Sequence, residues 1–140
     1  MKNIESFIAG LLPDAGNVHA RLLQTLCSIQ QRYSYIPEKA ILLLTEHLHI
    51  PPNEILSVIN FYAFLHTKPR GDFDILFSDN ITDRMFGNQT LLDRLCEKLD
   101  VKTGITSADN RVTIDLTSCT GLCDQGPALL VNGMAVSNLD

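Results

Sequence analysis

The sequence of 140 residues lacks the motifs of nucleotide-binding, hydrolytic and membrane proteins. It contains no Gly-x-Gly-x-x-Gly fingerprint and no Walker loop, so nucleotide chemistry has to come from another chain or domain. It contains no Gly-x-Ser-x-Gly elbow, which removes sequence support for a Ser-His-Asp hydrolase. Its longest apolar runs, 40–44 and 61–65, are far shorter than the ~20 residues that cross a bilayer. We therefore expect no membrane insertion.

Positive charge is also scarce. The chain has 16 acidic and 11 basic residues, a net charge of -5, and no cluster of Lys and Arg. Proteins that bind nucleic acid or anionic lipid surfaces need such a cluster, so neither is an expected partner. Glu5 interrupts the apolar start of the chain and no small-residue cleavage pattern follows, which argues against a signal peptide. The sequence thus predicts a cytoplasmic protein.

The first half of the sequence has the spacing of helices. Apolar residues recur every three or four positions over 18–33, as in an amphipathic helix. Pro37 suits the first turn of a second helix that ends near Leu48. Asn53 is the expected cap of a third, shorter helix that reaches about residue 62. We therefore expect a small helical bundle over residues 1–68.

The second half alternates between the period of strands and that of a helix. In chain order it predicts a strand, a helix and three further strands, over 73–77, 91–99, 112–116, 128–131 and 134–136. Asn132-Gly133 tolerates the positive φ angles of a type I′ turn between the last two strands. The fold class is therefore α+β. Because no helix follows the last strand, we expect a partner to cover the remaining sheet face, or the chain to be part of a longer polypeptide.

Four cysteines in a chain without a secretory signal indicate metal or redox chemistry, or inert core thiols, more than a disulfide framework. Cys119 and Cys123 lie four positions apart on a Gly-containing loop after a predicted strand, so both sulfurs can point at one centre. This spacing alone leaves a metal site and ordinary loop thiols equally open. Cys27 and Cys96 lie on apolar helix faces, where a small hydrophobic role is expected.

The order of these features resembles one family, the thioredoxin-like [2Fe-2S] ferredoxin or 24 kDa-type subunit of respiratory NADH dehydrogenase, with the related modules of NAD-reducing hydrogenases and NAD-linked formate dehydrogenases. The resemblance rests on segments spread along the chain, namely 26–33, 36–37, 50–51, 58–64, 68–71, Gly87, Thr113, 119–127 and 131–133. It implies a helical bundle over 1–68 and a thioredoxin-like α/β domain over 69–140 that lacks the terminal helix. It also implies a non-catalytic, electron-transfer-type module whose partner, a diaphorase subunit or domain, binds FMN and NAD(H).

One departure from this family concerns its [2Fe-2S] cluster. In the family four thiolates hold the cluster, a Cys-x4-Cys pair and a Cys-x3-Cys pair. Only the second pair is present here, as Cys119 and Cys123. Alignment on Gly87 and the first predicted strand puts Ser78 and Asp83 at the positions of the first pair. Hydroxyl and carboxylate are harder donors than thiolate, so we expect this chain to hold no cluster.

Three functions compete on this basis. The favoured one is a cluster-less docking platform for the flavin- and NAD(H)-binding subunit or domain, in which the thiols are vestigial. The second is a [2Fe-2S] electron carrier held by Cys119, Cys123, Ser78 and Asp83. The third is a thioredoxin-like dithiol, which is disfavoured because the two cysteines do not begin a helix after the first strand.

Two surfaces are candidates for contact with the partner. The terminal hairpin is expected to expose an apolar sheet face that carries Leu129, Val131 and Met134, through which the flavoprotein binds and the isolated chain self-associates. The aromatic cluster 61–64 is expected to be either part of a core or a partner-facing surface.

Overall fold

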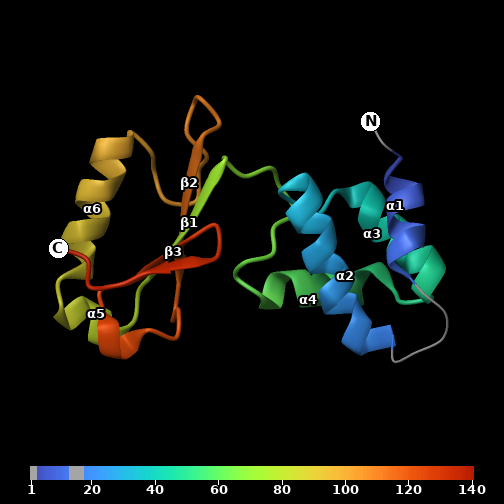
Figure 1. The fold of residues 1–140 in the computed structure, drawn as a ribbon, viewed down its shortest axis with the longest axis horizontal. Coiled ribbons are helices and arrows are strands. Elements are labelled where there is room, and N and C mark those ends of the chain that lie inside the picture. The colour runs from blue at the N-terminus through green and yellow to red at the C-terminus, as the bar shows by residue number, and fades with distance from the viewer. Residues whose placement is uncertain (1–2, 13–17) are drawn as a thin grey trace. The chain divides into compact units, whose positions relative to one another are not determined.

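The chain forms two compact units, Met1–Pro69 and Arg70–Asp140. The computed structural model describes residues 3–12 and 18–140. Figure 1 shows a first unit of helices and a second unit of helices and strands. Each unit has its own cluster of buried apolar side chains. The chain thus has two hydrophobic cores, one in each unit.

The helices of the first unit, within the described residues, are α1 (Ile4–Leu11), α2 (Val18–Tyr33), α3 (Glu38–Leu48) and α4 (Pro52–Phe61). The helices expected over 18–33 and up to Leu48 are confirmed by α2 and α3. An additional helix, α1, begins after Asn3, whose side chain accepts a hydrogen bond from the Glu5 N–H at 3.3 Å. This bond satisfies one of the free N–H groups at the start of the helix.

The expected cap of α4 is wrong. The helix begins at Pro52, so Asn53 lies inside its first turn, and Pro51 occupies the N-cap position. Proline suits the first helical position because the N–H it lacks has no partner there and its φ is already helical. The pair of prolines therefore sets the start of α4.

Apolar side chains from all four of these helices form the core of the first unit. Its largest fully buried members are Ile8, Leu22, Leu26, Ile29, Ile36, Leu44, Ile55 and Ile59. Gln30 ties the segment after α4 to this core. Its side-chain oxygen accepts the His66 N–H at 2.7 Å, and its NH₂ group donates to the Phe64 carbonyl. In the aromatic cluster 61–64, Tyr62 packs partly buried against the core, whereas Phe61 is 79% exposed.

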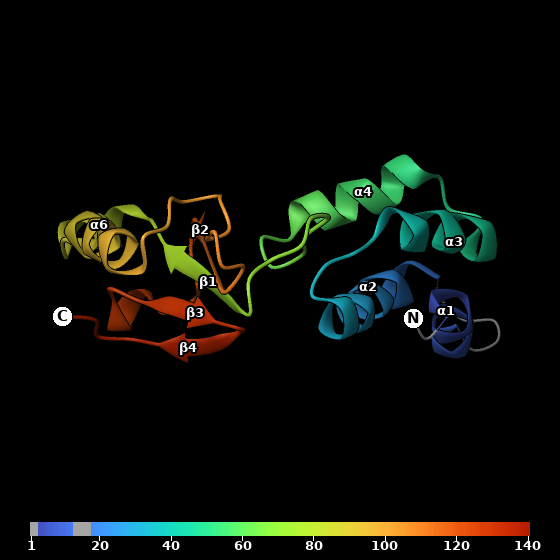
Figure 2. The ribbon, with the colours of Figure 1, turned by 90° about the horizontal axis from the view of Figure 1, so that it is seen from above.

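The second unit is built on a four-stranded mixed sheet with the order β2-β1-β3-β4. Its strands are β1 (Phe73–Ser78), β2 (Val112–Thr117), β3 (Leu129–Val131) and β4 (Met134–Val136). β1 and β2 are parallel, and the other neighbours are antiparallel. Helices α5 (Ile81–Met85) and α6 (Asn88–Leu99) connect β1 to β2 (Figure 1), and Figure 2 shows α6 on one side of the sheet. The predicted strands and the long helix are confirmed, and α5 is additional.

The apolar side chains of β1 pack on the side of α6. The register pairs Ile75 with Ile114 and Phe77 with Leu116, so these side chains share a face, and Leu92 of α6 joins the same cluster. Leu76 lies between Ile75 and Phe77 and therefore points to the opposite face of the sheet, yet it is also buried. Burial in β1 is therefore not confined to the face that carries Ile75 and Phe77.

The start of the second unit is fixed by Arg70 and Gly71. The Arg70 guanidinium bridges two neighbouring strands, with Nη1 donating to Asp115 at 2.7 Å and Nε to Asp74 at 3.0 Å. The Gly71 N–H donates to the Thr113 hydroxyl at 2.8 Å. A Cβ at residue 71 would lie 2.5 Å from the backbone nitrogen of residue 112, so only glycine fits this close approach.

The terminal hairpin has the predicted turn. Asn132 and Gly133 have φ angles of 50° and 80°, as a type I′ turn requires. The expected bare apolar face is wrong for Leu129, which is buried in the core cluster with Val131 packed against that cluster. The reason is the antiparallel register, which places both residues on the face of Phe77 and Ile75. Of the three residues expected on that face, Met134 is exposed, at 70%.

Within residues 3–12 and 18–140, none of the helices has the length and apolar character needed to cross a bilayer.

Candidate functional site

The loop after β2 brings the two loop cysteines together. The Sγ atoms of Cys119 and Cys123 lie 3.2 Å apart, and both residues are exposed. Gly121 has a φ of 81°, the left-handed conformation that turns the loop back, and its N–H donates to the Cys119 sulfur at 3.2 Å. A short 3-10 helix, η1 (Cys123–Gln125), follows. The pair expected to share one centre is therefore within reach of one atom.

Ser78 and Asp83 form a pair of their own. Ser78 is the last residue of β1 and is 2% exposed, whereas Asp83 lies in α5 and is 1% exposed. The Ser78 hydroxyl donates to Asp83 Oδ2 at 2.5 Å. The other carboxylate oxygen, Oδ1, is buried without a hydrogen-bond partner. The main side-chain hydrogen bond of each residue is thus the one to the other.

Asn80 connects the two pairs. Its side-chain nitrogen lies 3.6 Å from the Cys123 sulfur and 3.4 Å from the Ser78 hydroxyl oxygen, and can donate to either. Its side-chain oxygen accepts the Asp83 N–H at 2.9 Å, which caps α5. The structure therefore brings all four sequence-predicted positions into one site. Sequence reasoning missed Asn80, although an Asn three residues before a carboxylate is a recognisable capping signal.

The surroundings of Asp83 are tight and polar. A Cβ at Gly126 would lie 2.5 Å from Asp83 Oδ1, so the loop after Cys123 packs directly on the carboxylate. Asn88 donates to the Ser78 carbonyl at 3.0 Å. The side-chain oxygens of Asn88 and Thr120 are also buried without a hydrogen-bond partner. Buried polar groups of Asn88 therefore border Ser78.

Electrostatics distinguish the two ends of the site. The pKa of the Cys123 thiol is raised, first by its hydrogen bond to Cys119, then by burial and by the charges of Cys119 and Asp83. The pKa of the Asp79 carboxyl is lowered, chiefly because Arg84 donates to it at 2.8 Å. Among the described residues, no group of three or more His, Cys, Asp or Glu side chains is arranged to hold a metal ion.

The other two cysteines have the hydrophobic role expected of them. Cys27 and Cys96 are partly buried and pack against the cores of the first and second units, respectively. Burial raises the pKa of both thiols.

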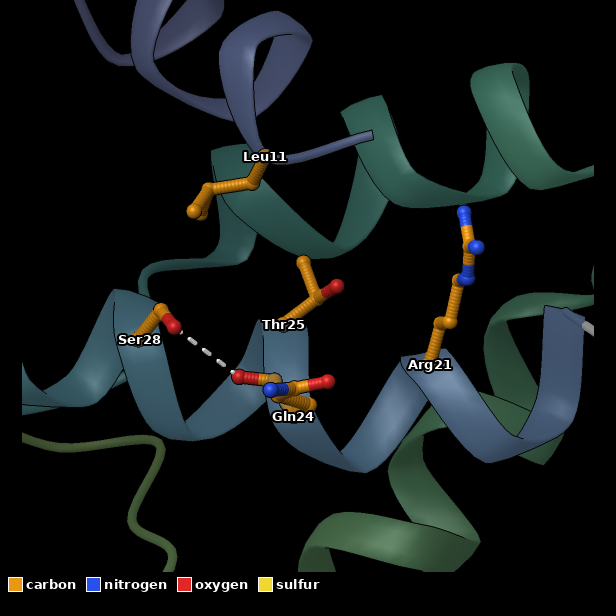
Figure 3. A pocket seen from close by; sticks show the side chains of 5 residues that line it. All are labelled: Leu11, Arg21, Gln24, Thr25 and Ser28. Carbon is orange, nitrogen blue, oxygen red and sulfur yellow. Dashed lines mark hydrogen bonds between the residues drawn. The ribbon is translucent and has the colours of Figure 1, made fainter. Parts of the chain in front are cut away.

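Two hollows in the first unit offer no comparable chemistry. One, of about 340 Å³, is lined by Leu11, Arg21, Gln24, Thr25 and Ser28 (Figure 3). In it the Ser28 hydroxyl donates to the Gln24 backbone carbonyl at 3.0 Å. The other, of about 510 Å³, lies between α2 and α4 and has Phe61 and Tyr62 in its wall. The described lining residues of the two hollows include no thiol and no imidazole.

Comparison with known proteins identifies the family. A profile of the thioredoxin-like [2Fe-2S] ferredoxins matches residues 8–140. The chain belongs to this family. Over 113 residues it is 30% identical to a subunit of the NADH-quinone oxidoreductase of Escherichia coli (strain K12), a match that covers 81% of this chain and 68% of the relative. The resemblance that the sequence motifs indicated is thereby confirmed.

Hydrogenases supply further relatives of this thioredoxin-like ferredoxin. The chain is 26% identical over 136 residues to the NAD-reducing hydrogenase HoxS subunit alpha of Cupriavidus necator, a match over 97% of this chain and 23% of the relative. A solved NAD+-reducing [NiFe]-hydrogenase in the air-oxidized state superposes with a TM-score of 0.68 at 33% identity over 82% of this chain. The chain spans about a fifth of that hydrogenase chain.

The donor atoms of this family member do not fit a [2Fe-2S] cluster. The cluster of this family is held by four thiolates, and only Cys119 and Cys123 supply sulfur at the corresponding site. The Ser78 hydroxyl keeps its proton directed at Asp83, so it is not available as an anionic ligand. Ser78 and Asp83 are also almost fully buried, while the two cysteines are exposed.

Proposed function

We propose that this chain is a cluster-less accessory module of an NADH:acceptor oxidoreductase, which docks the flavin- and NAD(H)-binding subunit or domain of that complex. The module itself is non-catalytic, and FMN and NAD(H) belong to the partner. The proposal includes a cytoplasmic location, because exposed free thiols suit a reducing compartment.

The hydrogen bond between Ser78 and Asp83 carries the proposal. A family member that bound a cluster through these positions would need both side chains as anions directed at iron. Here one side chain donates its proton to the other at 2.5 Å inside the protein. A buried carboxylate is stabilised by such a donor. The pair is therefore better suited to a buried hydrogen bond than to the role of two cluster ligands.

The relatives support the docking role. They are named as a subunit of NADH-quinone oxidoreductase and as a subunit of an NAD-reducing hydrogenase, so both act within larger assemblies. The surface next to the site is suited to such a contact. Ile81 and Met85, one turn apart on α5, are 79% and 82% exposed, and Phe86 is 61% exposed. Exposed apolar side chains that gather in one place commonly mark a protein interface.

Metal analysis tests the cluster-less state. We expect the chain, purified and reconstituted with iron and sulfide under anaerobic conditions, to hold far less than one cluster per molecule and to show no sulfur-to-iron charge-transfer bands. Stoichiometric iron and sulfide would overturn the proposal. That result would support the alternative, an electron carrier whose [2Fe-2S] cluster is held by Cys119, Cys123, Ser78 and Asp83. Two observations favour this alternative: the four residues lie together, and Asp83 Oδ1 has no hydrogen-bond partner.

A gain-of-function variant tests the ligand positions. Ser78→Cys with Asp83→Cys supplies the missing thiols and should allow cluster assembly on reconstitution. The control is Asp93→Cys with Thr103→Cys, which adds two thiols at exposed positions of the same unit and should stay colourless. If the first variant folds and stays colourless as well, the assignment of residues 78 and 83 to the ligand positions is wrong.

Binding experiments test the docking role. The flavin- and NAD(H)-binding subunit should bind the unmodified chain, and Met85→Asp should weaken this binding at least tenfold, because it puts a charge into the apolar contact. The control Thr103→Asp adds the same charge at another exposed position and should bind as the unmodified chain does. The docking role is refuted if the flavin- and NAD(H)-binding subunit does not bind the unmodified chain.

A further inference from the structure

We infer that Cys119 and Cys123 form a reversible intramolecular disulfide, so that this module carries a thiol-redox site in place of the family's cluster ligands. The inference rests on the cluster-less state proposed above, because thiolates bound to iron are not free to oxidise. It adds to the docking role a chemistry that depends on the thiol-disulfide state of the surroundings.

The geometry of the pair favours this bond. The two Sγ atoms are 3.2 Å apart, whereas a disulfide bond is about 2.05 Å long, so closure moves each sulfur by little more than half an ångström. The movement is confined to an exposed loop that contains Gly121, whose left-handed conformation is accessible to glycine without strain. Both thiols are exposed, so an oxidant reaches them.

A metal ion is a poorer occupant of the same pair. A closed tetrahedral site needs four donors, and among the described residues no third His, Cys, Asp or Glu joins the two thiols in a metal-binding arrangement. The Asp83 carboxylate is hydrogen-bonded to Ser78 and packed against Gly126. A disulfide bond between the two sulfurs is therefore favoured over a metal site.

The redox step balances with a small disulfide, such as glutathione disulfide, as the oxidant. One cysteine thiolate attacks a sulfur of glutathione disulfide, which breaks its S–S bond, forms a mixed disulfide and releases one glutathione. The second cysteine attacks the protein sulfur of the mixed disulfide and releases the second glutathione. The two cysteines lose two electrons and two protons, which leave on the two glutathione molecules, and excess glutathione reverses both steps.

Oxidation of the two cysteines also affects the contacts around Asp83. The Asn80 side chain contacts the Cys123 sulfur at 3.6 Å and caps α5 through the Asp83 N–H. When Cys123 closes onto Cys119, its sulfur changes from a thiol to a disulfide sulfur and shifts relative to the Asn80 donor. The redox state of the loop is therefore linked by direct contacts to the start of α5, which carries the exposed apolar side chains.

The test is a titration of the full chain in glutathione buffers of rising oxidised fraction. Reactive thiols are trapped with a maleimide and counted by mass, and iron is measured on the same samples. We expect the trapped thiols to fall from four to two as the buffer becomes oxidising, and to return to four when reduced glutathione is added. The two thiols still trapped in the oxidised form should be those of Cys27 and Cys96.

Matched variants locate the bond. Cys27→Ser with Cys96→Ser should keep the transition, with trapped thiols that fall from two to none. Cys119→Ser and Cys123→Ser should each abolish it, and should accumulate a glutathione adduct on the remaining loop cysteine because no second thiol resolves it.

Several outcomes separate the two proposals. Four trapped thiols at the oxidising end, in a chain without iron, overturn the disulfide and leave the docking module standing. A covalent dimer, or an adduct that persists in the unmodified chain, also overturns it. Stoichiometric iron together with protected loop thiols overturns both.

Discussion

Removal of the Ser78 hydroxyl should destabilise the second unit of the chain. Ser78→Ala leaves Asp83 with neither carboxylate oxygen hydrogen-bonded by a side chain, at a position that is 1% exposed. A hydrogen bond to a charged group contributes about 1.5–3 kcal/mol, and its loss leaves a desolvated charge. We therefore expect the free energy of unfolding of the second unit to fall by about 1.5–3 kcal/mol.

Native-state hydrogen exchange measures this loss directly. Buried amides of β1 should exchange about 10- to 150-fold faster, since each 1.4 kcal/mol corresponds to a factor of ten. The first unit provides an internal control, because all three tyrosines of the chain, Tyr33, Tyr35 and Tyr62, lie in Met1–Pro69. Unfolding followed by tyrosine fluorescence should be unchanged.

Two further variants decide whether the reasoning holds. Ser118→Ala makes the same chemical change at an exposed position near the cysteine loop and should alter stability by less than about 0.5 kcal/mol. Ser78→Ala combined with Asp83→Ala should cost less than the sum of the single changes, by about 1 kcal/mol or more, because the orphaned charge is gone. If Ser78→Ala behaves like Ser118→Ala, the bond does not stabilise the protein.

Three other predictions concern single contacts. Gly126→Ala should destabilise the second unit by about 1–3 kcal/mol in urea unfolding, because the new Cβ lies 2.5 Å from Asp83 Oδ1, and Asp83→Ala in the same chain should recover most of the loss. Tyr62→Ala should lower the melting temperature of the first unit by about 5 °C or more without change in flavoprotein binding, since Tyr62 packs on the core; the reverse result would make it a partner contact. Arg84→Met should reduce the fall in the free energy of unfolding that occurs at acid pH, as measured by urea unfolding at several pH values. Arg84 lowers the pKa of Asp79, so its stabilisation is present above the unfolded pKa of about 3.9 and is lost as pH falls below that value.

Elements with a clear period or a specific turn could be predicted from the sequence. The stripe over 18–33 predicted a helix with the bounds of α2, and Asn132-Gly133 predicted the hairpin turn. Both depend on neighbours within a few residues. The five-residue helix α5 is too short to show a period, and its local signal is the cap at Asn80.

Long-range contacts explain most of the remaining differences. Nothing local to Leu129 says that it will be buried, because its burial follows from the antiparallel pairing with Phe77, which places it in the core cluster of the second unit. The Arg70 bridge joins residues 45 positions apart, and no spacing rule predicts it.

The candidate site was predictable in part. The family motifs pointed to residues 78, 83, 119 and 123, and these residues do lie together in the structure. The sequence could not show that Ser78 and Asp83 bond to each other, or that Asn80 joins them to Cys123, because side-chain direction at the end of a strand depends on the loop that packs against it.

The central position of β1 has a consequence for protein synthesis. The first unit ends at Pro69, so all of its contacts are available once that part of the chain has left the ribosome. β1 follows directly but pairs with β2 and β3, and the last of these partners ends at Val131, about 50 residues later. At 5–20 residues per second this takes about 3–10 s. During that time the apolar run Ile75–Phe77 cannot pair with both of its neighbouring strands, so it stays exposed to non-native association.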